Sequence, residues 1–156
     1  MNAYTITQNV AALLATIRHS EGTDREPDPY RVVFGYGYTL TDLSDHPLIT
    51  GEWLGAHWSG GFSTAAGAYQ INHTTWLGCR TFIRLPDFGA LSQDQAACLL
   101  MDQKGAYRAI YRGDFAGAVS LCRGIWASLP DSPADQPHAD MAGLTQFYTD
   151  AGGAFA

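Results

Sequence analysis

The stretch TITQNVAALLATIRHSEG, residues 5–22, carries the clearest secondary-structure signal in the chain. Thr5 and Gln8 have the spacing of a capping box, in which two side chains bond the free amides at the start of a helix. The apolar residues that follow recur with the period of a helix: Val10, Leu13, Leu14 and Ile17. Gly22 stands where a helix-ending glycine is expected. The stretch therefore predicts an amphipathic helix that ends at Gly22.

Glu21 is the last residue of this predicted helix. It lies four residues after Ile17, so it extends the apolar stripe rather than the solvated face. Partial burial and the negative end of the helix dipole both disfavour the carboxylate, so both are expected to raise the pKa of this side chain. A carboxyl group of that kind can act as a general acid near neutral pH. The alternative is an ordinary surface glutamate at a helix end.

Beyond Gly22 the chain separates a β-rich part from a helical part. Residues 30–40 are rich in aromatic and β-branched residues broken by glycine, which predicts strands or a bent hairpin. Residues 51–67 contain five glycines, which predicts mostly loop or irregular strand. Helical patterning returns from about Thr74. Strands that are segregated from helices in this way indicate an α+β fold.

Three further helices are expected in the second half of the chain. A capping box that begins at Ser92 opens a helix that stops at Gly105. Asp114 is expected to cap a helix that reaches Trp126. A last helix is expected over residues 139–151, after a proline-rich loop.

The composition fits one domain and excludes several classes of protein. A chain of 156 residues, 46% of them hydrophobic, can bury a core unaided, so we expect a single domain over residues 1–156. The formal net charge of −6 disfavours nucleic acid and anionic membrane surfaces as partners. No stretch approaches the roughly 20 apolar residues of a membrane span. The N-terminal residues lack the pattern of a secretory signal, so we expect a soluble protein without its own export signal.

The cysteines and histidines indicate no metal or covalent chemistry. Cys79, Cys98 and Cys122 are widely spaced and odd in number, which predicts reduced, buried thiols, with one disulfide as the alternative. A Cys–His peptidase is disfavoured because two of these thiols fall on apolar helix faces. No pair of histidines has the spacing of zinc ligands, so we expect neither a metal site nor a cofactor.

Short blocks spread along the chain carry a family resemblance. HSEGT at residues 19–23 is followed by TDLSDHP at 41–47, STAAGAYQI at 63–71 and IWASLP at 125–130. Shorter blocks stand between and beside them, at 34–35, 85–88, 92–94, 105–106 and 112–114. In this order the blocks resemble the lambda-type phage endolysins, which are peptidoglycan lytic transglycosylases of lysozyme-like fold. The resemblance covers about residues 18–153, which is nearly the whole chain.

The resemblance implies both a fold and a site. The fold is a lysozyme-like α+β fold with a small β-containing lobe, a larger helical lobe and a cleft between them. Glu21 is implied to be the catalytic acid, with Tyr69 and Gln70 bordering the cleft. Further substrate contacts are expected from Tyr36, Asp42, His46 and Thr64. Family members commonly carry a basic residue before the tyrosine, whereas this chain has Ala68, so one electrostatic contact to the glycan or peptide is in doubt.

The resemblance also implies a reaction. Glu21 would cleave the β-1,4 bond between N-acetylmuramic acid and N-acetylglucosamine, and the C6 hydroxyl of the muramoyl residue would close a 1,6-anhydro ring. A hydrolytic lysozyme would need a second carboxylate, for which Asp42 and Asp45 are candidates. Their alternative role is to cap a turn. Glu26 and Glu52 are interpreted as solvated side chains.

Substrate binding and biological setting follow as expectations. Trp53 and Trp58, which lie among glycines, are candidates for stacking on sugar rings, or else belong to a loop folded over its own tryptophans. A glycan-binding module without activity is the alternative from another class, although such a module needs no carboxyl on an apolar stripe. We expect a monomer that degrades the peptidoglycan glycan strands during host lysis. It would stay in the host cytoplasm until a holin-like membrane protein opens the membrane, and then act in the periplasm and cell wall.

Overall fold

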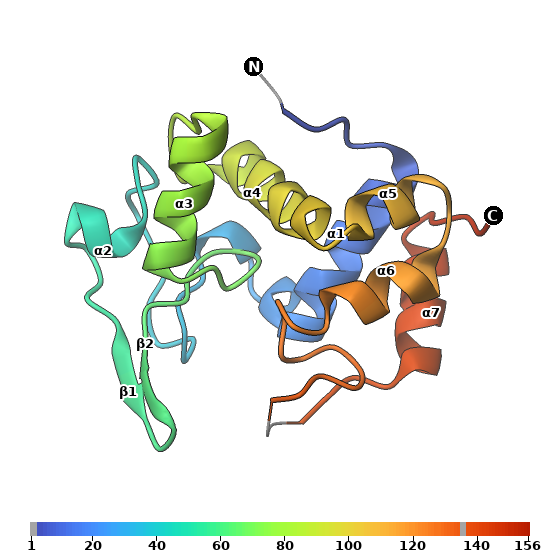
Figure 1. Ribbon diagram of the computed structural model, residues 1–156. Coiled ribbons are helices and arrows are strands. Elements are labelled where there is room, and N and C mark those ends of the chain that lie inside the picture. The colour runs from blue at the N-terminus through green and yellow to red at the C-terminus, as the bar shows by residue number, and fades with distance from the viewer. Residues whose placement is uncertain (1–2, 135–136) are drawn as a thin grey trace. The chain divides into compact units, whose positions relative to one another are not determined.

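The computed structural model describes residues 3–134 and 137–156 (Figure 1). Within these residues the secondary structure consists of α-helices, two short 3-10 helices and one antiparallel pair of strands. The helices are α1 (Gln8–Glu21), α2 (Pro47–Thr50), α3 (His73–Ile83), α4 (Ala90–Gln103), α5 (Ala106–Tyr111), α6 (Phe115–Cys122) and α7 (Met141–Asp150). The strands are β1 (Ala56–Trp58) and β2 (Gly61–Ser63), and the 3-10 helices are Thr23–Arg25 and Pro29–Arg31.

The chain divides into two compact units. The mixed unit is Thr23–Ala96 and holds both strands, α2, α3 and the first half of α4. The helical unit contains the described residues up to Gly22 and from Ala97 onward. In the helical unit, α1 packs against α5 and α7, and α5 packs against α6. Among the described residues, no helix is both long enough and apolar enough to cross a membrane.

Helix α1 confirms the predicted first helix and its glycine end. Gly22 adopts the left-handed conformation with φ 78°, and its amide bonds the carbonyls of Arg18 and His19. The start of the helix differs from the prediction, because Thr7 rather than Thr5 is the N-cap. The Thr7 backbone is extended and its hydroxyl accepts a hydrogen bond from the Val10 amide at 3.4 Å. The four predicted core positions are all buried: Val10, Leu13, Leu14 and Ile17.

The later helices of the helical unit follow their predicted caps but not all of their predicted ends. Asp114 caps α6 and accepts from the Gly117 amide at 2.9 Å, as expected. Helix α6 ends at Cys122, however, short of the predicted Trp126. Gly124 lies two residues beyond this end, and glycine is a poor helix residue, so the chain turns before the buried Trp126. Helix α7 matches the expected last helix.

The structure decides between the alternatives that the sequence left open for the β-rich part of the mixed unit. Residues 30–40 form no strand, only isolated bridges such as Val32 to Thr39. Gly35 and Tyr36 both have positive φ, 85° and 59°, and so turn the chain after a few extended residues. The strand pair β1–β2 falls within the glycine-rich segment, for which loop or irregular strand was predicted, with His57 opposite Phe62.

Helix α4 begins two residues before the predicted capping box. Ser92 is therefore inside the helix, where its buried hydroxyl donates to Asp87 Oδ1 at 2.8 Å. The same carboxylate oxygen accepts from the Gly89 amide at 2.8 Å. Asp87 thus serves the polar groups at the helix start, a role that the sequence pattern had assigned to Ser92. Helix α3 begins at His73 with Asn72 as its cap, which confirms the helix expected from about Thr74.

The three cysteine side chains are buried thiols, as predicted. Burial raises the pKa of Cys79 to about 11 and that of Cys122 to about 12. Thiols of this kind stay protonated near neutral pH, so they are core residues rather than nucleophiles.

Glu52 has a structural role that the sequence interpretation missed. Its carboxylate is half-buried and accepts hydrogen bonds from the Thr41 amide (2.6 Å), the Thr41 hydroxyl (2.7 Å), the Asp42 amide (3.0 Å) and the Tyr38 hydroxyl (3.1 Å). Burial alone would raise the pKa of Glu52, but these donors outweigh it and hold the pKa at about 2. Glu52 therefore ties the segment around Thr41 to the glycine-rich loop.

The change Glu52→Gln is expected to lower the free energy of unfolding at pH 7 by about 1–2 kcal/mol, because charge-assisted hydrogen bonds at a partly exposed site are lost. The pKa of Glu52 is lower in the folded state, so this contribution is present at neutral pH and is lost as pH falls from about 4.5 to about 2. Urea unfolding at several pH values measures both effects. Glu26→Gln is the matched control, because the Glu26 carboxylate accepts no hydrogen bond from the described residues. Equal stability of Glu52→Gln and wild type at pH 7 would contradict the assignment.

Candidate active site

Glu21 is held at the C-terminal end of α1 beside two serine hydroxyls of the helical unit. Its side chain is half-buried, because the position continues the apolar stripe of α1 just before the turn at Gly22. The Ser128 hydroxyl donates to Glu21 Oε1 at 2.5 Å. The Ser20 hydroxyl in turn donates to the Ser128 hydroxyl oxygen at 2.9 Å. Ser20, Ser128 and Glu21 thus form a directed chain of hydrogen bonds that ends on the carboxyl group.

Two opposing effects set the proton affinity of Glu21. Burial raises the pKa of the carboxyl group and is the larger effect, while hydrogen bonds from the Ser128 hydroxyl and amide lower it. The pKa of Glu21 therefore stays above its ordinary value. A group in this position can carry a proton nearer neutrality, and Ser128 stabilises the anion once the proton has left. Both properties are required of a carboxyl group that acts as an acid and then as a base.

Ser128 was missed by the sequence reasoning, although it lies in the IWASLP block that was singled out. The segment leaves α6 through turns, and the Leu129 amide donates to the Trp126 carbonyl at 3.2 Å. Leu129 and Trp126 are buried, which fixes the backbone on both sides of Ser128. The Ser128 carbonyl accepts from the Ala139 amide at 2.9 Å. A serine flanked by buried apolar residues was the available signal, but no periodicity connects it to Glu21.

Ser128→Ala is expected to raise the pKa of Glu21 further, because it removes a donor that stabilises the carboxylate. The alkaline limb of the pH–activity profile should move to higher pH, and kcat should fall about tenfold at the optimum. The measurement is the pH dependence of kcat on a soluble glycan substrate. Ser20→Ala is the matched control, since it leaves the Ser128 hydroxyl in place and should shift the limb less. An alkaline limb at the wild-type position in Ser128→Ala would show that this hydrogen bond does not act on the acid.

Tyr69 and Gln70 lie on a tight turn of the mixed unit. Tyr69 is fully buried, and its hydroxyl donates to Asp94 Oδ1 at 2.5 Å. Gln70 is half-buried with a positive φ of 48°, and its side-chain amide donates to the Gly67 carbonyl at 3.1 Å. The tyrosine ring therefore anchors the turn, while the glutamine is the more accessible of the two predicted residues.

The buried Gln93 side chain holds this turn from α4. Its Oε1 accepts from the Ala68 amide at 2.8 Å, and its Nε2 donates to the Phe88 carbonyl at 2.6 Å. A Cβ on Gly67 would lie only 2.1 Å from Gln93 Oε1, so the close approach requires glycine at a position whose φ is already 77°. The sequence blocks contained Gln93 and Asp94, but nothing in their spacing predicted contact with the turn.

His46 is fully enclosed by the mixed unit. Its Nδ1 accepts from the Leu48 amide at 3.2 Å, and its Nε2 lies 3.2 Å from the Ile71 carbonyl, which assigns the ring proton to Nε2. Burial lowers the pKa of His46 to about 4. The neutral ring therefore joins the start of α2 to the end of the Gln70 turn, and we now assign His46 a positioning role. Thr64 lies close to the same region, where its half-buried hydroxyl accepts from the His73 amide at 3.0 Å.

Stability should fall on acidification because His46 binds its proton only after unfolding. Between its ordinary pKa and the folded value of about 4, the unfolded chain takes up the proton and the folded chain does not. The His46 contribution alone should lower the free energy of unfolding by about 2 kcal/mol between pH 7 and pH 5. His46→Asn keeps an acceptor for the Leu48 amide, and it should be less stable at pH 7 but lose less stability at pH 5. Denaturant unfolding of both proteins checks this, and an identical pH dependence would contradict it.

Asp45 and Asp42 differ sharply in their surroundings. Asp45 is buried and accepts from the His46 amide at 2.8 Å and from Trp76 Nε1 at 2.9 Å, and it also pairs with Arg80. Asp42 is exposed and accepts from the Ser44 amide at 2.8 Å, and hydrogen bonds from the Ser44 hydroxyl and then the Ser44 amide lower its pKa. Asp42 therefore caps a turn, and Asp45 belongs to an internal ion pair.

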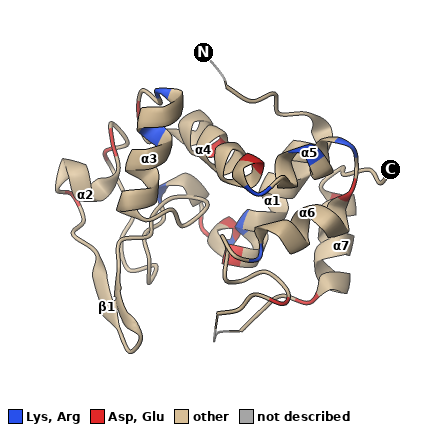
Figure 2. Ribbon diagram, viewed as in Figure 1, with Lys and Arg blue, Asp and Glu red and all other residues tan. Residues whose placement is uncertain are grey.

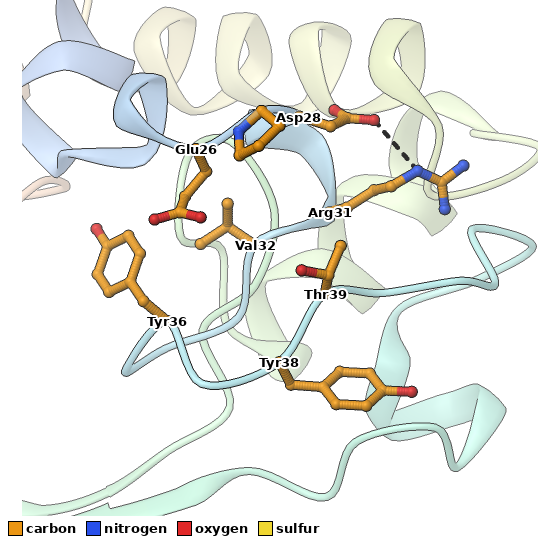
Figure 3. Close-up of a pocket in the computed structure, with 8 residues that line it drawn as sticks. Glu26, Asp28, Arg31, Val32, Tyr36, Tyr38 and Thr39 are labelled. Atoms are coloured by element: carbon orange, nitrogen blue, oxygen red, sulfur yellow. Dashed lines mark hydrogen bonds and ion pairs between the residues drawn. The ribbon is translucent and has the colours of Figure 1, made fainter.

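Tyr36 lines a small hollow of about 90 Å³ in the mixed unit (Figure 3). The ring of Tyr36 is 45% exposed and that of Tyr38 is 43% exposed, so both can meet a ligand. Figure 3 shows the Glu26 carboxylate on the same side of the hollow as Tyr36, while Arg31 extends away to its partner Asp28 at 3.1 Å. Glu26, interpreted from the sequence as solvated, is thus half-buried in the wall of a hollow. Aromatic rings beside a carboxylate are a combination that suits a sugar ring.

The two tryptophans of the glycine-rich segment differ in exposure. Trp58 is 52% exposed at the end of β1, and its ring centroid lies 6.1 Å from that of Phe34. Trp53 is half-buried. Stacking of Trp58 on a sugar stays a prediction that its exposure permits. Among the described residues, no three His, Cys, Asp or Glu side chains are grouped so that they could hold a metal ion.

Comparison with known proteins extends these observations over the whole chain. Residues 11–155 match the endolysin family. The chain is 37% identical to the endolysin of Escherichia phage P2 over 155 residues, covering 94% of this chain and 94% of that protein. It is 36% identical to the endolysin of Escherichia phage lambda over 149 residues, covering 91% of this chain and 90% of that protein.

Solved structures show the same relationship. The bacteriophage lambda lysozyme complexed with a chitohexasaccharide is similar with a TM-score of 0.88 and 33% identity, over 98% of this chain and 99% of that one. A second structure of the lambda lysozyme gives a TM-score of 0.85 with 31% identity and the same coverage. Sequence and structure thus agree along nearly the full length, and the chain belongs to the lambda-type phage endolysin family, with the α+β fold of the lambda lysozyme.

Proposed function

We propose that this endolysin cleaves the glycan strands of bacterial peptidoglycan as a lytic transglycosylase. The observation that carries the proposal is the half-buried Glu21 carboxyl group, whose pKa is raised and which accepts a hydrogen bond from Ser128. One carboxyl group is sufficient for this reaction, because it gives up a proton in the first step and takes up a proton in the second.

The first step breaks the glycosidic bond. Protonated Glu21 gives its proton to the oxygen that links C1 of N-acetylmuramic acid to C4 of N-acetylglucosamine, and the C1–O bond breaks with its electron pair moving to that oxygen. The departing sugar leaves with a neutral hydroxyl, and positive charge develops at C1. Glu21 is now a carboxylate, which the Ser128 hydroxyl and amide stabilise.

The second step closes a ring. The Glu21 carboxylate takes the proton of the C6 hydroxyl of the same muramoyl residue while O6 attacks C1. A 1,6-anhydro ring forms and Glu21 is protonated again, so no water is consumed. The attacking hydroxyl belongs to the substrate, so proximity replaces the positioning of a water molecule.

The surroundings of the other carboxylates favour this single-acid reaction. Hydrolysis by a glycosidase usually needs a second carboxylate as base or nucleophile. Asp45 is engaged with Arg80, and Glu52 holds the segment around Thr41. Asp42 is occupied by the Ser44 amide. Glu26, in the wall of the Tyr36 hollow, is the carboxylate to test if water proves to be the attacking group.

The residues that contact the substrate and the biological role of the enzyme are proposed from the same observations. The lambda relative is described with a bound chitohexasaccharide, and we assign glycan contacts in this chain to Tyr36 and Gln70, with Tyr69, Thr64 and His46 supporting the backbone. We propose that the enzyme acts as a monomer during phage lysis. Its access to the wall then depends on a holin-like protein that opens the membrane.

Mass spectrometry of the fragments released from purified peptidoglycan tests the reaction. We expect products lighter by one water than muropeptides with reducing ends. Glu21→Gln should lower kcat by about a thousandfold, because the proton donor is lost. Glu52→Gln is the matched control for the amide substitution, and it should release the same anhydro products under conditions in which it is folded.

Other outcomes would change the assignment. Reducing ends would mean that water attacks C1, and Glu26→Gln and Asp42→Asn would then identify the second carboxylate. Unchanged cleavage by Glu21→Gln would remove Glu21 from the mechanism. Binding without any fragments in both wild type and Glu21→Gln would indicate a glycan-binding module.

A further inference from the structure

A second hollow, of about 310 Å³, lies on the surface of the helical unit. It is lined by three residues of α5 and by the residue that follows the helix: Tyr107, Arg108, Tyr111 and Arg112. Neither Glu21 nor its serine partners contribute to it. Figure 2 shows basic residues on α5 in a chain whose formal net charge is −6. The mechanism proposed above does not use this surface.

One wall of this α5 hollow is held firmly in place. The Tyr107 hydroxyl donates to the Thr5 carbonyl at 2.8 Å, and its ring meets the Tyr4 ring edge-on with the centroids 4.9 Å apart. Tyr4 is itself anchored through its hydroxyl, which donates to Asp102 Oδ2 at 3.2 Å. The Tyr107 ring is therefore a preformed surface that loses little freedom when a ligand binds.

The other wall is open and positively charged. Tyr111 is 52% exposed, and its ring centroid lies 6.1 Å from that of Tyr107. Arg108 and Arg112 are exposed and stand four residues apart, so they share one face of the helix. Neither guanidinium has an ion-pair partner within the described part of the chain. Two uncompensated cations beside two aromatic rings are an unusual surface for an acidic protein.

The chemistry of the α5 hollow points to a compact anionic group. Guanidinium groups bind carboxylates through two parallel hydrogen bonds, and tyrosine rings pack against the apolar parts of the same ligand. A bilayer is a poor fit, because binding at a membrane surface calls for a broad basic face, which a net charge of −6 opposes. The hollow is also concave, which suits a group that enters it.

We propose that the α5 hollow binds the carboxylates of the peptidoglycan stem peptides, as a second attachment site that takes no part in the reaction. The proposal rests on the proposed function, since it names another part of the same polymer. Stem peptides repeat along each glycan strand and carry free carboxylates. A second contact with the same polymer keeps the enzyme at a high local concentration of glycosidic bonds between one cleavage and the next.

The test is binding to purified sacculi in the Glu21→Gln background, in which cleavage does not confuse the measurement. Co-sedimentation compares Glu21→Gln alone with the protein that also carries Arg108→Gln and Arg112→Gln. We expect the added pair to weaken binding to intact sacculi about tenfold, since two charge-assisted contacts are lost. Sacculi whose stem-peptide carboxylates have been converted to amides with a carbodiimide and ammonia stay insoluble, and they should bind both proteins equally.

A matched control separates the site from the net charge. Arg84→Gln with Arg123→Gln makes the same change in charge at two other exposed arginines, which form no ion pair with the described residues. This control pair should leave binding to intact sacculi unchanged. Circular dichroism and thermal unfolding establish that all the variants are folded.

Four results would overturn the proposal. Undiminished binding by Arg108→Gln with Arg112→Gln would show that the hollow does not hold the wall. Equal weakening on the amidated sacculi would assign the arginines to a part of the wall other than the stem-peptide carboxylates. Equal weakening by the control pair would assign the effect to net charge. Weakened binding to phosphatidylglycerol vesicles with unchanged binding to sacculi would assign the surface to a membrane. None of these results depends on product analysis, so they are independent of whether the glycosidic bond is broken by transglycosylation or by hydrolysis.

Discussion

The hydrogen bond from Ser128 to Glu21 is the constraint on which the chemistry proposed for this endolysin depends. Without a hydrogen-bond donor, the pKa of a half-buried carboxyl group would be too high for it to form a carboxylate readily. The pKa of an exposed carboxyl group would be too low for it to hold a proton near neutral pH. The fold avoids both by ending α1 at Gly22 and by bringing a serine from beyond α6 against the carboxyl group. The buried residues on either side of that serine keep the donor in position, so the packing of Leu129 and Trp126 contributes indirectly to the acid.

The mixed unit also depends on hydrogen bonds from side chains that connect separate segments of the chain. Its loops are irregular, and they are held by buried or half-buried polar side chains rather than by a large sheet. Gln93 and Asp94 hold the turn that carries Tyr69, and Asp45 joins two segments through Trp76 and Arg80. Within the described residues, no buried side-chain nitrogen or oxygen lacks a hydrogen-bond partner. A loop region organised in this way can present accessible groups such as Gln70 and Tyr36 from a stable backbone.

In the functions proposed here, the acid and the α5 hollow divide two tasks between different parts of the helical unit. Chemistry needs a desolvated group whose protonation changes within one reaction cycle. Retention on an anionic polymer instead needs permanent charges that stay accessible, which is what Arg108 and Arg112 offer. If these charges lay beside Glu21, they would stabilise its carboxylate and lower its pKa, so less of it would carry a proton near neutral pH. A separation between the Glu21 carboxyl group and these arginines is therefore chemically favourable.

Local sequence by itself determined α1, its end at Gly22 and the exceptional position of Glu21, because helix periodicity and capping act over a few residues. It also determined the α+β class and, through ordered blocks, the family. Only the tertiary structure decided that Asp87 serves the start of α4, that residues 30–40 bend rather than form strands, and that Ser128 reaches Glu21. These features join residues that are distant in the chain or depend on backbone turns such as the one at Tyr36. The spacing of residues along one sequence does not predict such contacts, because they form only when packing brings the segments together.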